Sequence, residues 1–550
     1  MSHRLITTFF FLGILGMSHA QLDRQRTHRL DSLFELWQRP KGPGGAIGIM
    51  ENGRTVYSRA FGMASLEYGV PNQPTTLFNA ASVSKQFTAL GIVLLHLEGT
   101  LDLDRDINAY LPDMPTFEQP ITLRQMLHHT SGLRSLHDML ALGGWRGDDL
   151  RTNEDLYRFL RQQEELNFRP NDRYMYSNTG YMLMARIIES LTGEEFAPWM
   201  GRRIFVPLGM SDTYVEDRYD RVVPHNATSY HVKGDSYVRA VEYWGYVGSG
   251  NMHTTTGDLL LYLSNYSRPK KGWEAAFEMM RTTDNFNDGS PNDYAFGLRL
   301  DSLYGKARIQ HSGSIGGFRA HVASYPLEDL HIALLANYSR ADPGRMVTEI
   351  SKIMFDASPP PPPGPIKTLK TRPGQLERLS GDYWDQDAQE GWQVSMDRDS
   401  LRATHKLTGR QRTLLPVTRS SFVALEDPDL EFTFMDQGEG QSLQISDKGR
   451  PVANFKPYDP LPEKDLSRYT GQFYSPELEA LYGIYLKDGV LYSHHMRHGD
   501  HPLKWIKEHV FQGSGPLDLI VFTSSPETGI NGMRVSNGRV KKVKFIKVNL

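Results

Sequence analysis

The sequence predicts an α/β sandwich (α+β), an antiparallel sheet with helices, followed by two small antiparallel β-barrel-like domains. Residues 21–357 mix strand-like and helix-like periodicity, with strands near both ends of the segment. A run of five prolines then interrupts the chain, and two stretches of short alternating strands with matching motifs follow it. Because 550 residues are too many for one hydrophobic core, several domains are expected.

Composition narrows the classes of protein to which the chain can belong. Hydrophobic residues make up 39% of the chain and charged residues 23%, which is typical of soluble globular proteins. The 61 Lys and Arg residues nearly balance the 64 Asp and Glu residues, so we expect neither a nucleic-acid partner nor binding to an anionic membrane. The absence of cysteine excludes disulfides, thiolate metal sites and a cysteine nucleophile.

The first 20 residues have the pattern of a secretory signal peptide. Arg4 precedes the apolar run Leu5–Gly16, and Ser18–Ala20 offers small residues for cleavage before Gln21. A membrane anchor is the weaker interpretation, because this apolar run is too short to span a bilayer. No later stretch is apolar enough for a membrane span. We therefore expect a periplasmic or secreted mature chain.

Proline-rich segments mark the domain boundaries. Five consecutive prolines within 358–365 cannot enter a helix or a central strand, so this segment should form a stiff polyproline linker. A second break lies at Pro457–Pro462, and we expect it to separate cores. The predicted domains are residues 21–357, 366–456 and 463–550.

The last two domains look like copies of each other. Leu379–Tyr383 matches Tyr469–Phe473, and the two motifs begin 90 residues apart. Both domains alternate apolar and polar residues in short runs, and Asp488-Gly489 is a two-residue hairpin signal. We expect two small lipocalin-like barrels, filled by their own side chains.

Local patterns also predict the elements of the first domain. Glu51–Gly53 is a hairpin turn between two apolar runs, and Glu98-Gly99 ends a stripe of apolar residues at helical spacing. The sheet should pair strands from the two ends of the domain. The expected elements are strands at Ala46–Met50, Arg54–Phe61, Arg308–Gln310, Ala320–Tyr325 and Leu330–Asn337, and a helix at Ser82–Leu97.

Three short patterns in the first domain carry chemistry. They are an S-x-x-K at Ser82 and Lys85, a Y-x-N at Tyr176 and Asn178, and an H-x-G that begins at His311. S-x-x-K alone is uninformative, because about two matches are expected by chance in such a chain. Occurring together in this order, the three patterns predict a serine acyl-transfer enzyme.

Each pattern has a physical rationale. Ser82 and Lys85 are three residues apart on a helix, so their side chains share one face. The start of a helix offers free backbone N–H groups and a positive dipole, which can bind an oxyanion and lower the pKa of the lysine. Tyr176 can supply a second proton-transfer group. Asn178 can orient a substrate carbonyl and contact Lys85.

The chain resembles the serine β-lactamases and penicillin-binding-protein-like hydrolases, in the branch of class C β-lactamases, D-aminopeptidases and esterases. The resemblance rests on FNAASVSKQFTAL, LRQMLHHTSGL, YSNTGYMLMARIIESLTG, GSGNMHTTTGDLLLY and HSGSIGGFRAHVASYP, and it spans most of residues 40–340. It implies a β-lactamase-like sandwich and an acyl-serine mechanism without a cofactor or metal.

The resemblance also implies roles for individual residues. Ser82 is the expected nucleophile, and Lys85 and Tyr176 share the duty of general base. Asn178 would hold the substrate amide. The remaining substrate-binding residues would be His311, Gly313 and Ser314, with the backbone N–H groups of Ser82 and Ser314 forming the oxyanion hole.

One departure from the family pattern bears on the substrate. Many β-lactamases have lysine where His311 stands, and a neutral imidazole holds the carboxylate of an antibiotic less well. This favours peptides with a free amino end, amides of D-residues, or esters. The alternatives are a β-lactamase or D,D-peptidase acting on β-lactams or peptidoglycan peptides, and a non-catalytic sensor of peptidoglycan fragments. The resemblance further suggests that residues 463–550 send a loop towards the cleft.

A histidine cluster in the last domain is the strongest candidate for a metal site. We expect a solvated hairpin tip there instead, because no carboxylate pattern or helix organises the cluster. The cluster consists of His494, His495, His498 and His501.

Overall fold

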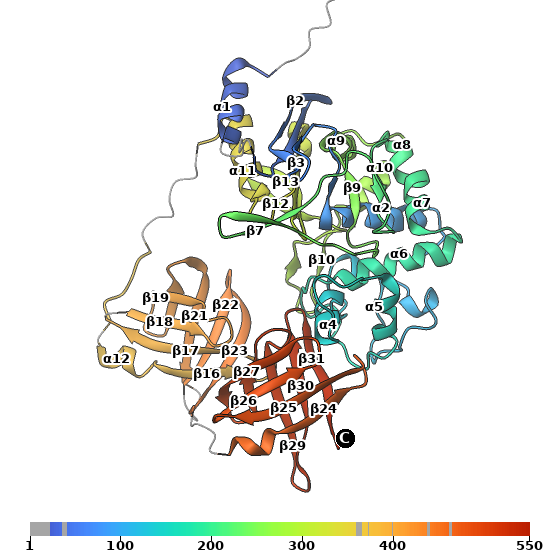
Figure 1. Ribbon diagram of the computed structural model, residues 1–550. Helices are drawn as coiled ribbons and strands as arrows, with labels where there is room; N and C mark the ends of the chain where they lie inside the picture. Colours follow the sequence, from blue (N-terminus) through green and yellow to red (C-terminus); the bar gives the residue numbers. More distant parts are fainter. Residues whose placement is uncertain are drawn as a thin grey trace, which may run out of the picture.

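The computed structural model shows a mixed domain followed by two barrels (Figure 1). The predicted signal peptide, residues 1–20, and the prolines of the linker lie outside the residues that the structure describes. Within the described part, no helix is long and apolar enough to cross a membrane. The described residues are 22–35, 41–358, 366–371, 373–398, 400–436, 441–460 and 465–549.

A six-stranded antiparallel sheet forms the centre of the first domain. β1 pairs with β15 from Gly45↔Ala336 to Glu51↔Leu330, so the sheet joins the two ends of the domain as predicted. The predicted hairpin turn between β1 and β2 places Asn52 and Gly53 at positive φ. The strands in sheet order are β12 (Arg299–Leu303), β13 (Lys306–Ile315), β14 (Phe318–Tyr325), β15 (Leu330–Ala336), β1 (Gly45–Glu51) and β2 (Arg54–Phe61).

Helices cover both faces of this sheet, because its central strands are apolar on both sides. On one face, α1 (Arg24–Phe34) and α11 (Pro343–Met354) pack over side chains such as Ile47. On the other face, α9 (Thr256–Leu263) packs over the neighbouring positions of the same strands, and α2 (Ser84–Leu97) belongs to the same apolar cluster. This is the predicted sandwich.

The remaining elements of the first domain lie between β5 and β12. They form a mainly helical region beside the sheet (Figure 1). The helices are α3 (Leu123–Leu127), α4 (Leu136–Leu142), α5 (Asn153–Leu160), α6 (Asn178–Thr192), α7 (Phe196–Met200), α8 (Val206–Leu208) and α10 (Glu274–Met279). The short strands here and after β2 are β3 (Met63–Ser65), β4 (Val70–Pro71), β5 (Phe78–Asn79), β6 (Tyr214–Val215), β7 (Tyr230–Lys233), β8 (Ser236–Arg239), β9 (Met252–Thr254), β10 (Asp284–Asn285) and β11 (Pro291–Asn292).

Two closed eight-stranded barrels follow, each with its strands in sequence order. The first begins after α12 (Pro373–Glu377) and comprises β16 (Gly381–Asp385), β17 (Glu390–Asp397), β18 (Ser400–His405), β19 (Gln411–Pro416), β20 (Ser421–Ala424), β21 (Asp427–Asp436), β22 (Gln441–Asp447) and β23 (Arg450–Tyr458). The second comprises β24 (Gly471–Ser475), β25 (Ala480–Lys487), β26 (Val490–His495), β27 (Gly499–Lys507), β28 (Val510–Gln512), β29 (Leu519–Ser525), β30 (Gly529–Asn537) and β31 (Val540–Val548).

The barrels repeat each other in register as well as in sequence. Their first strands start at Gly381 and Gly471, which are 90 residues apart, as the motif spacing predicts. Tyr383 pairs with Trp392 in the first barrel, and Phe473 pairs with Tyr482 at the same place in the second.

The two barrels differ in how they pack. The first has a core of its own, whereas most of the buried apolar residues of the second belong to the same continuous cluster as the helical region of the first domain. The main apolar clusters of the two barrels are separate on either side of the break at Pro457–Pro462, and a small third cluster joins Trp384 of the first barrel to Ile506, Val510 and Leu519 of the second. The second barrel packs on the first domain, which is distant from it in sequence. Local composition contains no information about that contact.

Candidate active site

Ser82 lies at a strained turn that follows the short strand β5. It belongs to a 3₁₀ turn, Ala81–Val83, and the α-helix begins at Ser84, two residues later than predicted. Ala81 has a φ of 50°, which is uncommon for a residue with a Cβ, and its N–H donates to Asn79 Oδ1 at 2.9 Å. Such strain persists only where surrounding contacts enforce it, and it places the half-buried Ser82 at the cleft.

Lys85 lies one helical turn beyond Ser82 and is fully buried. Its Nζ is 3.4 Å from Ser82 Oγ, 2.8 Å from Asn178 Oδ1 and 2.7 Å from the carbonyl oxygen of Ser249. No carboxylate forms an ion pair with Lys85 among the described residues. Burial, with a smaller contribution from the positive charge of Arg539, therefore holds the pKa of Lys85 well below its usual value.

Tyr176 and Asn178 come from the segment that leads into α6. The Tyr176 hydroxyl lies beside Ser82, and it has no hydrogen-bond partner among the described residues. Burial raises the pKa of Tyr176, so the phenol keeps its proton at neutral pH. Asn178 is the first residue of α6 and contacts Lys85, as the sequence analysis anticipates.

The H-x-G pattern, which begins at His311, lies on β13 next to the turn that holds Ser82. Gly313 is required there because a Cβ would lie 2.4 Å from the carbonyl oxygen of Ala80. This close approach places Ser314 at the cleft opposite Ser82. His311 is buried, with Nε2 2.9 Å from the Tyr294 hydroxyl and Nδ1 2.6 Å from the carbonyl oxygen of Ser312.

His311 carries no charge at neutral pH. Burial, together with the positive charge of Lys85, lowers the pKa of His311 to about 3. Since the Ser312 carbonyl can only accept, Nδ1 is the protonated nitrogen and Nε2 accepts from Tyr294. This agrees with the neutral imidazole that the sequence analysis expects.

The fold brings all seven candidate residues to one cavity of about 1030 Å³. Lys85 does not line the cavity itself but is hydrogen-bonded to Ser82 and Asn178, and the other six residues line it. These six are Ser82, Tyr176, Asn178, His311, Gly313 and Ser314.

Several residues at the site were missed by the sequence analysis. Tyr294 holds His311, and the Ser249 carbonyl accepts from Lys85. His129 accepts from the Ser177 N–H through Nδ1 at 3.1 Å and packs on the Tyr176 ring, which is a structural role. Tyr294 and Ser249 both lie in loops, where periodicity gives no signal. No motif considered marks Tyr294, and Ser249 falls within the quoted segment GSGNMHTTTGDLLLY without being given a role.

The second barrel also contributes to the cavity. Its β30–β31 hairpin turns at Gly538-Arg539, and Arg539 lines the cavity with its Cζ 5.6 Å from the centre of the Tyr176 ring. A loop from residues 463–550 therefore reaches the cleft. The sequence analysis names the domain but does not single out Arg539.

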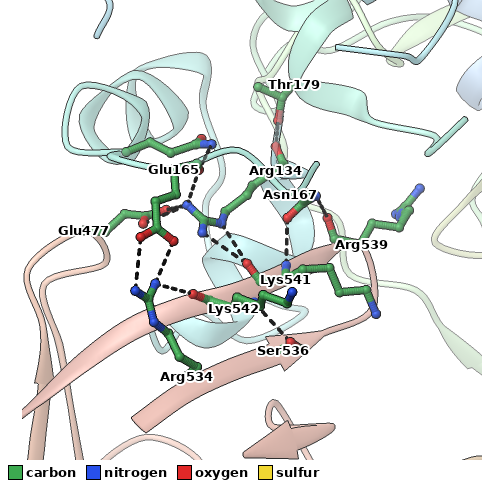
Figure 2. A network of polar contacts seen from close by, with 11 residues as sticks. Arg134, Glu165, Asn167, Thr179, Glu477, Arg534, Ser536, Arg539, Lys541 and Lys542 are labelled. Carbon is green, nitrogen blue, oxygen red and sulfur yellow. Dashed lines mark hydrogen bonds and ion pairs between the residues drawn. The ribbon is translucent and has the colours of Figure 1, made fainter. Parts of the chain in front are cut away.

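A polar network fastens this hairpin to the first domain (Figure 2). Arg134, in the segment before α4, is buried and donates to both carboxylate oxygens of Glu477 in the second barrel, at 2.8 and 2.9 Å. The Arg134 carbonyl oxygen accepts from Thr179 Oγ1 at 2.6 Å, and Thr179 follows Asn178 in α6. Asn167 donates to the carbonyl oxygen of Arg539 at 2.9 Å.

The histidine cluster docks against the first domain and forms no metal site. No group of three or more histidine, aspartate or glutamate side chains among the described residues could hold a metal ion. The cluster lies at the β26–β27 hairpin tip, as expected, but only part of the tip is solvated. His494 is exposed, whereas His495 is buried and packs on Tyr482, and His498 Nε2 lies 3.0 Å from the carbonyl oxygen of Ala141. The surface that covers these histidines belongs to the first domain, around Ala141, which is distant in sequence. The local pattern therefore could not predict their burial.

Comparison with known proteins identifies the family to which the chain belongs. The model of the beta-lactamase family matches residues 20–351. Penicillin-binding protein 4* of Bacillus subtilis is 33% identical over 327 residues, covering 55% of this chain and 70% of that protein. A D-aminopeptidase of Gluconobacter oxydans is 26% identical over 301 residues, covering 54% of this chain and 57% of the D-aminopeptidase.

Comparison with solved structures gives the same fold. An octameric penicillin-binding protein homologue from Pyrococcus abyssi superposes with a TM-score of 0.55 at 23% identity, covering 78% of this chain and all of that one. The chain therefore belongs to the beta-lactamase family of serine hydrolases.

Proposed function

We propose that the protein is an exported serine hydrolase that cleaves amide or ester bonds through an acyl-Ser82 intermediate. Amides or short peptides of D-amino acids and short esters are the proposed substrates, and the D-aminopeptidases among the similar proteins support this choice. The observation that carries the proposal is the contact of Ser82 with Lys85, a buried lysine that has no carboxylate partner among the described residues.

The surroundings of Lys85 suit a general base. A neutral amine has two N–H donors and one lone pair. Asn178 Oδ1 and the Ser249 carbonyl, at 2.8 and 2.7 Å, can take the two N–H groups, which leaves the lone pair for Ser82 Oγ. The depressed pKa of Lys85 keeps the amine available near neutral pH.

The reaction follows from these positions. Ser82 Oγ attacks the substrate carbonyl carbon while its proton passes to Lys85 Nζ. The backbone N–H groups of Ser82 and Ser314 bind the oxyanion of the tetrahedral intermediate. Its collapse breaks the bond to the leaving amine or alcohol, and Tyr176, a phenol whose pKa is raised by burial, relays the proton to the leaving group. Water then cleaves the acyl-serine in the reverse sequence.

A β-lactamase or D,D-peptidase activity is the second candidate, and the arginines at the cleft favour it. The neutral His311 cannot grip a substrate carboxylate as lysine does. Arg299 and Arg539, however, bring permanent positive charges to the same cavity. The argument against carboxylate-bearing substrates therefore applies to His311 alone.

Covalent labelling tests the proposed nucleophile. A fluorophosphonate probe should add one adduct to the wild-type protein and none to Ser82→Ala, as measured by intact mass. Ser267→Ala is the matched control, because Ser267 begins a second S-x-x-K pattern whose hydroxyl donates to the Pro326 carbonyl instead. Equal labelling of wild type and Ser82→Ala would refute the assignment. No labelling of wild type would favour a non-catalytic sensor.

A hydrolysis panel tests the substrate class. Turnover of D-aminoacyl amides and short acyl esters above that of a cephalosporin would support the proposal, and the reverse order would favour the β-lactamase alternative. Export rests on the N-terminal pattern alone. Expression of the full chain in a bacterium should give a periplasmic or secreted protein that begins at Gln21, and an intracellular protein that begins at Met1 would contradict it.

A further inference from the structure

The β13–β14 hairpin, which carries Ser314, ends in a turn that has no side chains. Ser314 pairs with Arg319 close to the tip of the hairpin. The two residues of the turn are Gly316 and Gly317, and Gly316 has a φ of 48°. The proposed mechanism uses the Ser314 N–H to bind the oxyanion, so the position of this donor depends on how the turn is held.

Glu242 holds the turn from outside the cleft. Its Oε1 accepts from the Gly317 N–H at 3.2 Å and from Ser229 Oγ at 2.8 Å. The Gly317 N–H also donates to Ser229 Oγ at 3.2 Å, so the three groups form a closed cluster. A Cβ on Gly316 would overlap Glu242 Oε1. The bare turn is therefore what allows the carboxyl group to approach the backbone so closely.

Glu242 also belongs to the segment that forms another wall of the cleft. Trp244 and Tyr246 follow it and line the cavity at Ser82. Further along the same segment, the Ser249 carbonyl accepts from Lys85 Nζ at 2.7 Å. Glu242 thus joins the wall that carries the oxyanion donor to the wall that contacts the lysine.

The carboxyl group of Glu242 lies among several charged groups. It lines a second cavity, of about 310 Å³, which the β13–β14 hairpin separates from the cavity at Ser82. Desolvation raises the pKa of Glu242 to about 7, and the negative charge of Glu216 adds to the rise. The hydrogen bonds from Ser229 and Gly317 and the positive charge of Arg319 oppose it. The other titratable groups that line this second cavity are Tyr219, Arg221, Arg239, Tyr243 and His253.

We infer that Glu242 is a positioning residue for the oxyanion donor of Ser314, because its carboxylate fixes the β13–β14 turn against the segment that leads to Ser249. A carboxylate is a stronger hydrogen-bond acceptor than a neutral carboxyl or amide oxygen. Ionised Glu242 therefore holds the turn more firmly, and a displacement of about 1 Å at a reacting centre can cost about 10²-fold in rate. The inference rests on the proposed function, since Ser314 has this role only if Ser82 forms an acyl-enzyme.

The pH dependence of two proteins tests the inference. Glu242→Gln keeps an acceptor oxygen in a side chain of the same size but cannot ionise. The quantity to measure is kcat of the wild type divided by kcat of Glu242→Gln, for a short acyl ester, across the neutral pH range. Lys85 ionises in both proteins, and Glu242 is not among the charges that shift its pKa, so this contribution cancels in the quotient.

The quotient should change with the charge of Glu242. Below about pH 6 the carboxyl group is protonated and the quotient should lie near unity. Above about pH 8 it should reach about fivefold or more, because hydrogen bonds to charged groups are stronger than those to neutral ones. Its midpoint should lie near the pKa of Glu242.

Two further variants separate positioning from stability. Glu216→Gln is the matched control, because this carboxyl group of the same cavity contacts His253 Nε2 at 2.8 Å instead of the turn. Its kcat at about pH 8 should stay within about twofold of the wild type. Glu242→Ala removes the acceptor and should lower kcat about 10²-fold with KM nearly unchanged, since the residue lies outside the cleft. The thermal midpoint of each variant is measured alongside.

The outcomes separate this inference from the proposed function. A quotient that stays constant across the pH range, or wild-type kcat in Glu242→Ala, would overturn the role of Glu242 while fluorophosphonate still labels Ser82. A constant quotient above unity is what a purely structural contribution gives, because it does not depend on charge. Loss of labelling in the wild type would overturn the proposed function itself. If Glu242→Ala fails to fold, the quotient with Glu242→Gln still decides.

Discussion

Arg134 of the hydrolase domain and Glu477 of the second barrel form a buried ion pair, with Nη1 2.8 and 2.9 Å from the two carboxylate oxygens. Their side chains are 1% and 9% exposed. The same arginine accepts from Thr179 through its carbonyl oxygen, so the pair connects the barrel to the start of α6, where Asn178 contacts Lys85. Docking of the barrel and the shape of the active site are thus coupled through α6.

Glu477→Gln should destabilise the protein. It leaves the buried Arg134 charge without its partner, which typically costs about 3 kcal/mol or more. Urea unfolding followed by circular dichroism measures the change. Asp113→Asn is the control, since it breaks an exposed ion pair with Arg161 and should cost less than about 1 kcal/mol. Equal effects of the two substitutions would show that the buried pair does not hold the interface.

Lys85→Ala and Tyr176→Phe should each lower kcat about 10²-fold or more. Positioned acid–base groups contribute rate factors of this size, and both side chains lie at Ser82. Steady-state kinetics on a short acyl ester, with Ser267→Ala as control, provides the measurement. Near-normal turnover of Tyr176→Phe would assign the whole proton transfer to Lys85.

The pH profile should report the charge of Arg539. Activity needs Lys85 uncharged, so kcat/KM for a neutral ester should rise with pH through the depressed pKa of Lys85. The positive charge of Arg539 contributes to that depression, so Arg539→Gln should raise the pKa of Lys85 and move the acidic limb to higher pH. Arg410→Gln, the same change at an exposed arginine of the first barrel, is the control and should leave the limb in place. A limb that stays fixed, or moves to lower pH, would contradict this electrostatic coupling.

Gly313→Ala should impair turnover more than folding. The new methyl group would lie 2.4 Å from the Ala80 carbonyl oxygen, which forces β13 away from the Ser82 turn. A shift of this kind typically costs about 10²-fold in kcat. Gly257→Ala is the matched control, because a Cβ there meets only Thr255 Oγ1 at 3.6 Å. Comparing kcat and the thermal midpoint of both variants decides whether Gly313 serves the site or the core.

Local patterns in the sequence were enough for most of the architecture. The β1–β2 hairpin at Asn52-Gly53 and the barrel hairpin at Asp488-Gly489 follow from turn chemistry that acts over a few residues. The doubled barrel followed from a motif repeated 90 residues later. Six of the seven site residues could be named because three ordered patterns matched one chemistry, and Ser314 could be named from the family resemblance. The fold brings all seven together.

Only the tertiary structure decided what else surrounds Ser82. Tyr294, Ser249 and Arg539 come from loops and from another domain, where contacts depend on the packing of distant surfaces and leave no periodic signal in the chain. The docking of the second barrel is of the same kind, since its apolar and charged contacts join residues more than 300 positions apart, such as Arg134 and Glu477. Short-range propensity sets turns, strands and helices, but the charge of the cleft is a sum over surfaces that meet only after folding.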